Sequence, residues 1–143
     1  MSRCVRGYPQ RCVTSVLSLS LASHLTFAGV PVFGLAGTVQ EEVAKELGLP
    51  FVAELYGDVK YSADGKLVID RKKKPWSAED TKKHISSQLE KSSVTAVTGE
   101  EVQLPLGDHD VSLCCHSDSP GAVSIVTAAR QMIDEFNKKH GYA

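Results

Sequence analysis

The sequence predicts an α/β protein in which parallel strands alternate with helices. Two strand-loop-helix units carry this prediction. In one, the apolar run 30–35 precedes a helix over 38–47, and in the other, the apolar run 111–115 precedes a helix over 120–140. Loops that leave the carboxyl ends of parallel strands hold the chemistry in such folds. The loop after residue 115 is therefore the first candidate for a functional site.

The composition describes one globular domain that acts on a small molecule or another protein. The chain has 143 residues, of which 42% are hydrophobic and 23% are charged, and its net charge is -1. This balance argues against a nucleic acid or a membrane surface as a partner. The 4 cysteines include no C-x-x-C pair, which argues against a disulfide framework and a structural zinc site. Free thiols favour a cytoplasmic location.

Residues 1–28 form a divergent N-terminal segment. Residues 1–40 contain no acid, and Arg3, Arg6 and Arg11 precede a stretch rich in Val, Leu, Ser and Ala. Such a start is typical of a secretory signal or a mitochondrial presequence, which makes the mitochondrion the alternative location. The apolar stretch is too short to span a bilayer, so a helix of an incomplete domain explains it equally.

Local signals divide the middle of the chain into further elements. The capping box over 38–41 starts the first helix, and Gly48 ends it. The run 51–55 is a second predicted strand. The turn pair 64–65 predicts a hairpin that returns as a short strand over 67–69.

The elements before the last strand also follow from their caps and turns. The basic run 71–74 is predicted to be a solvated loop, although such a run can also contact phosphate. Ser77 with Asp80 caps the next helix, on which His84 is predicted to lie at the exposed boundary. A small hairpin is predicted over 94–106. In the last unit, Ser119 is predicted to cap the final helix and Pro120 to occupy its first position.

Three polar clusters occur near strand ends. Glu54 and Asp58 follow one strand and residues 116–118 follow the last strand, whereas residues 108–110 precede it and should lie on the opposite, structural edge. A histidine with carboxylates can act as a general base, orient water or hold a divalent cation. Spacing alone leaves turn and capping roles open as well. The chain has no G-x-S-x-G, G-x-G-x-x-G or P-loop motif, so no nucleotide site of its own is predicted.

Three ordered motifs resemble the LamB/YcsF lactam-utilisation family, whose members are also described as the A subunit of 5-oxoprolinase. Residues 51–61 read FVAELYGDVKY and are similar to the family pattern E-x-F-A-D-R-x-Y. Residues 114–122 read CCHSDSPGA and are similar to C-x-H-G-D-[ST]-P-x-A. Between them lie Asp64-Gly65-x-Leu67-Val68 and Arg71, and the resemblance covers roughly residue 29 to the end.

The resemblance implies that residues 29–143 form the C-terminal half of a (β/α) barrel of the glycoside hydrolase/deacetylase type. It implies ATP-dependent ring opening of 5-oxoproline (pyroglutamate) or a related lactam to glutamate, with other 5-oxoprolinase subunits as partners. ATP would be bound through those subunits, and a metal requirement stays open. The catalytic residues implied are Glu54, Asp58, His116 and Asp118, and the substrate-binding residues are Tyr61, Arg71 and Ser117.

The chain also departs from the family pattern. A barrel of this type needs on the order of 250 residues, and the family motifs D-x-N-x-D-x-G-E, C-G-x-H-A-G-D and G-A-H-P have no counterpart. Residues 1–28 could therefore come from an artefact of the gene model, and truncation would impair catalysis. Val59 replaces an arginine that could have paired with Asp58 or a substrate carboxylate.

Two other functions stay open. One is a non-catalytic remnant or interaction protein that binds a homologue, a partner subunit or itself through an exposed sheet edge. The other is a relative of the carbohydrate-active deacetylases and glycosidases.

Overall fold

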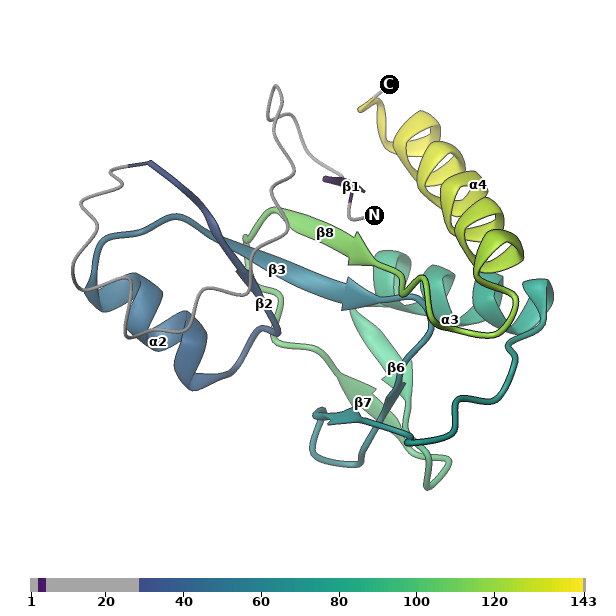
Figure 1. The fold of residues 1–143 in the computed structure, drawn as a ribbon. Coiled ribbons are helices and arrows are strands. Elements are labelled where there is room, and N and C mark those ends of the chain that lie inside the picture. The colour runs from purple at the N-terminus through teal and green to yellow at the C-terminus, as the bar shows by residue number, and fades with distance from the viewer. Residues whose placement is uncertain (1–2, 5–28, 143) are drawn as a thin grey trace.

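A computed structural model describes residues 3–4 and 29–142. The part of the chain that it describes forms one mixed sheet, two short hairpins and three helices (Figure 1). The elements in chain order are β1 (Arg3–Cys4), β2 (Val32–Gly34), α2 (Val39–Glu46), β3 (Phe51–Tyr56), β4 (Lys60–Tyr61), β5 (Leu67–Val68), α3 (Ala78–Lys91), β6 (Ser93–Thr95), β7 (Glu101–Gln103), β8 (Val111–Cys114) and α4 (Ala122–His140). The targeting prediction falls on residues 1–28, which, apart from β1, lie outside the described residues.

The main sheet has the strand order β1-β8-β3-β2. β2 and β8 both run parallel to the central strand β3, and β1 pairs antiparallel with β8. The predicted α/β class with parallel strands is therefore confirmed. The described strands form an open sheet, so closure into a barrel stays a prediction. The hairpins predicted at residues 64–65 and 99–100 are confirmed as β4–β5 and β6–β7.

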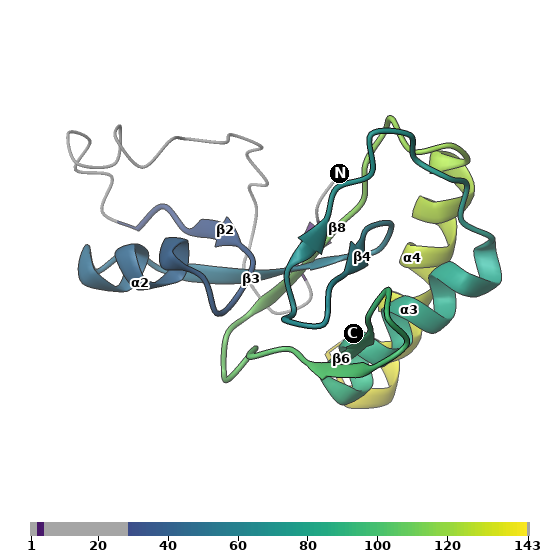
Figure 2. The same ribbon diagram turned by 90° about the horizontal axis from the view of Figure 1, so that it is seen from below.

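The core lies between the sheet and the helices α3 and α4. The two helices lie side by side beyond one end of the sheet, and α2 covers the other end (Figures 1 and 2). Leu55 of β3 and Leu113 of β8 share one buried cluster with Ile85 of α3 and Ile125 of α4. Because strand side chains alternate between faces, Glu54 and its even-numbered neighbours point to the opposite face of the sheet.

Two helices start at the predicted N-cap residues, but the capping box predicted at α2 does not form, since the Thr38 hydroxyl donates to the Leu35 carbonyl oxygen. Ser77 caps α3, since its hydroxyl accepts a hydrogen bond of 3.0 Å from the Asp80 backbone N–H. At α2, the N-cap is Thr38, as predicted. Its partner Glu41 accepts a hydrogen bond of 2.7 Å from the backbone N–H of Gly37 rather than from the capping residue. The starts of α2 and α3 were therefore predictable, whereas the bonding at the start of α2 was not.

The predicted start of α4 is wrong. The helix begins at Ala122 after Gly121, whose φ of 79° places it in the left-handed region. Ser119 and Pro120 lie in the preceding turn instead of capping the helix. The Ser119 hydroxyl donates to Asp58 and accepts from Nζ of Lys73 instead of capping the helix. Within the described ranges, none of the helices is both long and apolar enough to cross a membrane.

Candidate functional site

The carboxyl ends of β3 and β8 form one edge of the sheet. The two strands are adjacent and parallel, with Tyr56 in register with Cys114. Asp58 lies two residues beyond Tyr56, and His116 lies two residues beyond Cys114. Equal offsets from registered residues bring the carboxylate and the imidazole together, so parallel pairing is the physical reason for their contact.

The Asp58 carboxylate is buried and accepts three hydrogen bonds. The residue is only 5% exposed. Its Oδ1 accepts from Nδ1 of His116 at 2.8 Å, and its Oδ2 accepts from the His116 backbone N–H at 3.1 Å and from the Ser119 hydroxyl. A buried carboxylate is costly unless donors surround it. The loop over 116–119 therefore supplies the donors that keep Asp58 in place.

The contact with Asp58 also determines how the His116 ring can act. A neutral imidazole that donates from Nδ1 carries its free lone pair on Nε2. The side chain is 35% exposed, so a small molecule can reach it. The ring of Tyr56 stacks on it with centroids 6.3 Å apart and planes 14° apart. The carboxylate and the phenol thus fix an accessible base in one orientation.

Glu54 reaches the imidazole through Tyr56. The Tyr56 hydroxyl donates to Oε2 of Glu54 at 3.0 Å. Burial raises the pKa of Tyr56 well above its ordinary value, and the neighbouring Glu54 carboxylate raises it further. The phenol therefore stays protonated and remains a donor to Glu54. Glu54 is thus linked to His116 through Tyr56, whose hydroxyl donates to Glu54 and whose ring stacks on the imidazole.

Asp118 pairs with a residue that the sequence reasoning missed. Nζ of Lys73 lies 2.5 Å from Oδ1 of Asp118, and this hydrogen bond lowers the pKa of the Asp118 carboxyl. Lys73 also donates to the Ser119 hydroxyl at 3.4 Å. The prediction of a solvated loop is correct for the exposed Arg71 and wrong for Lys73, which is 27% exposed. The only sequence signal for Lys73 was the basic run that contains it.

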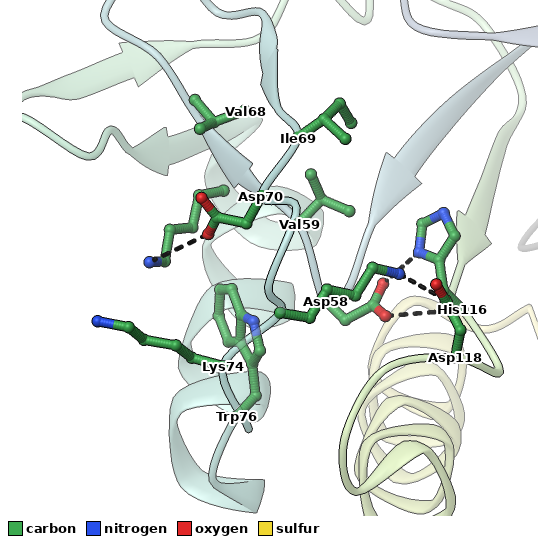
Figure 3. Close-up of a pocket in the computed structure, with 11 residues that line it drawn as sticks. Asp58, Val59, Val68, Ile69, Asp70, Lys74, Trp76, His116 and Asp118 are labelled. Atoms are coloured by element: carbon green, nitrogen blue, oxygen red, sulfur yellow. Dashed lines mark hydrogen bonds and ion pairs between the residues drawn. The ribbon is translucent and has the colours of Figure 1, made fainter.

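Asp58, His116, Asp118 and Lys73 line a pocket of about 240 Å³, whereas Glu54 and Tyr56 are not among its lining residues (Figure 3). Its wall combines acids, lysines and apolar groups, and its small volume suits a small metabolite better than a drug-sized ligand. The lining residues are Asp58, Val59, Lys60, Val68, Ile69, Asp70, Lys73, Lys74, Trp76, His116 and Asp118.

The three residues predicted to bind substrate do not converge on this pocket. Tyr61 is fully buried, and its hydroxyl donates to Oε1 of Gln88 at 3.1 Å and accepts from the Tyr56 backbone N–H at 3.3 Å. Burial raises the pKa of Tyr61. Arg71 and Ser117 are exposed and do not line the pocket. Tyr61 instead braces the end of β3 that carries the site.

The pocket wall does not include His109 or His84. His109 lies before β8, contacts Oε1 of Glu41 at 2.8 Å and packs edge-on against Phe51 at the start of β3. His84 has the predicted boundary position on α3. Its Nε2 is 3.1 Å from the Val59 carbonyl oxygen, and burial lowers its pKa. His109 thus belongs to the opposite edge of the sheet, as predicted for residues 108–110.

The described residues do not fit a metal ion. They contain no group of three or more His, Cys, Asp or Glu side chains that could hold one. Both Asp58 oxygens already accept hydrogen bonds from His116 and Ser119. Burial raises the pKa of the Cys115 thiol to about 12, which excludes a reactive thiolate there. The site offers a histidine base, a set of carboxylates and a lysine.

The fold and site define an α/β protein with a histidine–carboxylate site where adjacent parallel strands end. The sequence model of the LamB/YcsF family matches residues 15–141. The chain therefore belongs to the LamB/YcsF family, and the resemblance inferred from its motifs is confirmed.

The alignments with known relatives cover most of this chain but less than half of the length of each relative. A protein named lactam utilization protein lamB from Emericella nidulans is 58% identical over 114 residues, which is 80% of this chain and 45% of that protein. The A subunit of a 5-oxoprolinase from Mycolicibacterium gilvum is 36% identical over 118 residues, covering 81% and 45% respectively. The crystal structure of a lactam utilization protein from Thermus thermophilus superposes with a TM-score of 0.66 at 27% identity, covering 81% and 45%.

Proposed function

We propose that this chain contributes the His116 base to the ATP-dependent ring opening of 5-oxoproline, or a related lactam, to glutamate. The observation that carries the proposal is the Asp58–His116 pair at 2.8 Å on the wall of a small pocket. It is supported by relatives that are named as a 5-oxoprolinase subunit and as a lactam utilization protein. The reaction class is hydrolysis of a cyclic amide.

The chemistry requires activation of a stable lactam. ATP, held by partner subunits, supplies a phosphoryl group to the amide oxygen, which makes that oxygen a leaving group. His116 then accepts a proton at Nε2 from the water that adds to the activated carbon. Asp58 holds the reactive tautomer and stabilises the imidazolium that forms. The imidazolium of His116 then gives that proton to the ring nitrogen as the carbon–nitrogen bond breaks, which leaves an acyl phosphate and a free amine. A second water hydrolyses the acyl phosphate to glutamate and phosphate.

The remaining acids have supporting roles in this proposal. Asp118 holds the Lys73 ammonium at the pocket, and Glu54 orients the Tyr56 ring that stacks on the imidazole. The proposed setting is a (β/α) barrel whose remaining strands complete the pocket wall, because this chain spans about 45% of its relatives. The proposed location is the cytoplasm, with other 5-oxoprolinase subunits as partners.

The test is a reconstituted assay with the purified chain, the presumed partner subunits, 5-oxoproline and ATP, in which glutamate release is measured. His116→Gln should lower turnover by about 10²–10⁴-fold, the range for a lost general base. His109→Gln is the matched control, because its imidazole also lies 2.8 Å from a carboxylate but at the opposite edge of the sheet. Full turnover by His116→Gln would exclude the proposed base, and no turnover by the wild-type mixture would overturn the activity.

A second candidate function is self-association or binding to a homologue. Among the described strands, β2 lies at one edge of the sheet, and a parallel strand at such an edge can accept another strand. Light scattering on the isolated chain tests this function. A dimer or larger species that persists on dilution supports it, and a monodisperse monomer contradicts it.

A further inference from the structure

Lys73 places an ammonium group on the pocket wall close to the imidazole. It comes from the segment between β5 and α3, and its Nζ reaches the loop after β8, where Asp118 lies 2.5 Å and Ser119 Oγ 3.4 Å away. In Figure 3, Asp118 lies beside Asp58 and His116 at this end of the pocket. Lys72, next to Lys73 in the chain, is exposed and does not line the pocket. Lys73 therefore differs from Lys72 in that its side chain lines the pocket.

The Lys73 ammonium has one hydrogen-bond donor left for a ligand. An ammonium group carries three N–H donors. Asp118 and Ser119 take two of them, and the described residues supply no acceptor for the third. The Ser119 hydroxyl accepts from Lys73 while it donates to Asp58. The third donor is thus available to an acceptor in the pocket, and an anionic acceptor gives the strongest bond.

The acids on the pocket wall already have partners. Asp70 lies 3.8 Å from Nζ of Lys60, and Asp58 and Asp118 have the partners described above. Lys74 also lines the pocket, and no described carboxylate pairs with it. Each acid on the wall therefore has a donor or cation, while one lysine has no carboxylate partner among the described residues. The wall has no net excess of positive charge, because Asp58, Asp70 and Asp118 stand against Lys60, Lys73 and Lys74. The free donor of Lys73 therefore carries the preference for an anion.

We infer that Lys73 binds the anionic group of the substrate, which is a carboxylate in 5-oxoproline, and so selects acidic lactams over neutral ones. This inference rests on the proposed function and deepens it. The apolar side chains of Val68 and Trp76 on the same wall suit the methylene groups of a lactam ring. Lys73, Ser119, Asp58 and His116 form one continuous set of hydrogen bonds, so an anion held by Lys73 stays close to the base.

The experiment compares three ligands on the full 143-residue chain by NMR titration of backbone amides. The ligands are 5-oxoproline, the uncharged lactam 2-pyrrolidinone, and cyclopentanecarboxylate, which has a carboxylate but no lactam. In Lys73→Met, affinity for both carboxylates should fall by about tenfold or more, the usual scale for a charged hydrogen bond, while affinity for 2-pyrrolidinone stays unchanged. Lys73→Arg and the matched control Lys72→Met should keep the wild-type preference.

Each result decides between the inference and the proposed function. If Lys73→Met does not fold, Lys73→Gln, which keeps a polar group without the charge, takes its place. If the Lys73 variant keeps the wild-type affinity for carboxylates, or loses affinity equally for all three ligands, the inference is overturned. The role of Lys73 would then be structural, through its bonds to Asp118 and Ser119. If the wild type binds cyclopentanecarboxylate through Lys73 but neither lactam, the anion site stands and the lactam function falls. A wild type that binds 2-pyrrolidinone but shows no preference for carboxylates overturns the inference alone.

Discussion

Replacement of Asp58 by Asn should move the ring hydrogen of His116 from Nδ1 to Nε2. The Asn carbonyl oxygen can take the place of Oδ2 and keep the bonds from the His116 backbone N–H and the Ser119 hydroxyl. The amide nitrogen then takes the place of Oδ1, where it would meet the Nδ1–H that lies 2.8 Å away in the wild type. Two donors cannot bond, so Nδ1 must become the acceptor and the ring hydrogen must move to Nε2.

The magnitude follows from the bonds that change. A hydrogen bond to a charged group contributes about 1.5–3 kcal/mol, and the tautomer change restores a neutral bond of about 1 kcal/mol. Asp58→Asn should therefore lower the free energy of unfolding by about 0.5–2 kcal/mol. Its effect on turnover should be larger, about 10³–10⁴-fold, because the same exchange in a serine protease triad leaves the base in the wrong tautomer.

Nitrogen NMR of histidine-labelled chain at pH 8 reports which ring nitrogen carries the hydrogen, and urea unfolding gives the free energy. The matched control is Glu41→Gln, which alters the equivalent 2.8 Å contact of His109. That pair is more exposed, so the loss should stay below about 1 kcal/mol. A His116 ring that keeps its hydrogen on Nδ1 in Asp58→Asn, or a variant as stable as the wild type, would refute the reasoning.

Three further predictions test the surroundings of the site. Burial lowers the pKa of His84 in the folded chain. Below about pH 6.5 the unfolded chain therefore binds more protons at this residue than the folded chain does. The free energy of unfolding should then fall from pH 7 to pH 5. His84→Gln should flatten that slope in urea titrations, and parallel slopes would contradict the assignment. Gly57→Ala should cost about 1–3 kcal/mol in urea unfolding, since the new Cβ would lie 3.0 Å from Sγ of Cys115, and unchanged stability would count against this tight packing. The bond from Lys73 lowers the pKa of Asp118 and stabilises the folded chain at neutral pH, so the stability difference between wild type and Lys73→Met should narrow as the pH falls from 6 to 3. A difference that does not depend on pH would contradict the pair.

The convergence of Asp58 with His116 could be expected from the sequence because it depends on backbone topology. Apolar runs of strand length and capped helices predict parallel neighbours, and parallel neighbours end at one edge. The register of Tyr56 with Cys114 then places the two side chains at equal distances beyond their strands. No side-chain detail is needed for that step, so pattern reasoning was sufficient.

The roles of Ser119 and Lys73 could not be predicted in the same way. Ser119 has the local pattern of a helix cap, but its hydroxyl bonds to a carboxylate 61 residues earlier in the chain. Lys73 pairs with Asp118 across 45 residues, and nothing in the basic run distinguishes it from its neighbours. Both side chains have a local alternative that is nearly as favourable, a cap for the serine and water for the lysine. Contacts between distant parts of the chain determine which partner each side chain takes: Asp58 for Ser119, and Asp118 for Lys73. These contacts exist only in the assembled fold.

Tyr61 illustrates the limit of reasoning from a motif. Its place in the motif over 51–61 implied a contact with substrate. In the structure, its hydroxyl donates to Gln88 and accepts from the backbone N–H of Tyr56. A phenol that braces the end of β3 affects the site as strongly as one that touches a ligand, because it fixes the strand from which Asp58 follows. A motif alone does not distinguish these two roles.

The contacts that hold the His116 ring all come from the described part of this chain. Asp58, Ser119 and the stacked Tyr56 lie within residues 54–119, and the three donors to Asp58 are already present there. A buried carboxylate without such donors would destabilise the fold, so these bonds contribute to folding as well as to the orientation of the imidazole. That orientation is therefore a property of this chain, and in the proposed function partner subunits or further strands would complete the pocket rather than orient the base. For this reason the tautomer of His116 can be measured in the isolated chain, independently of the complete reaction.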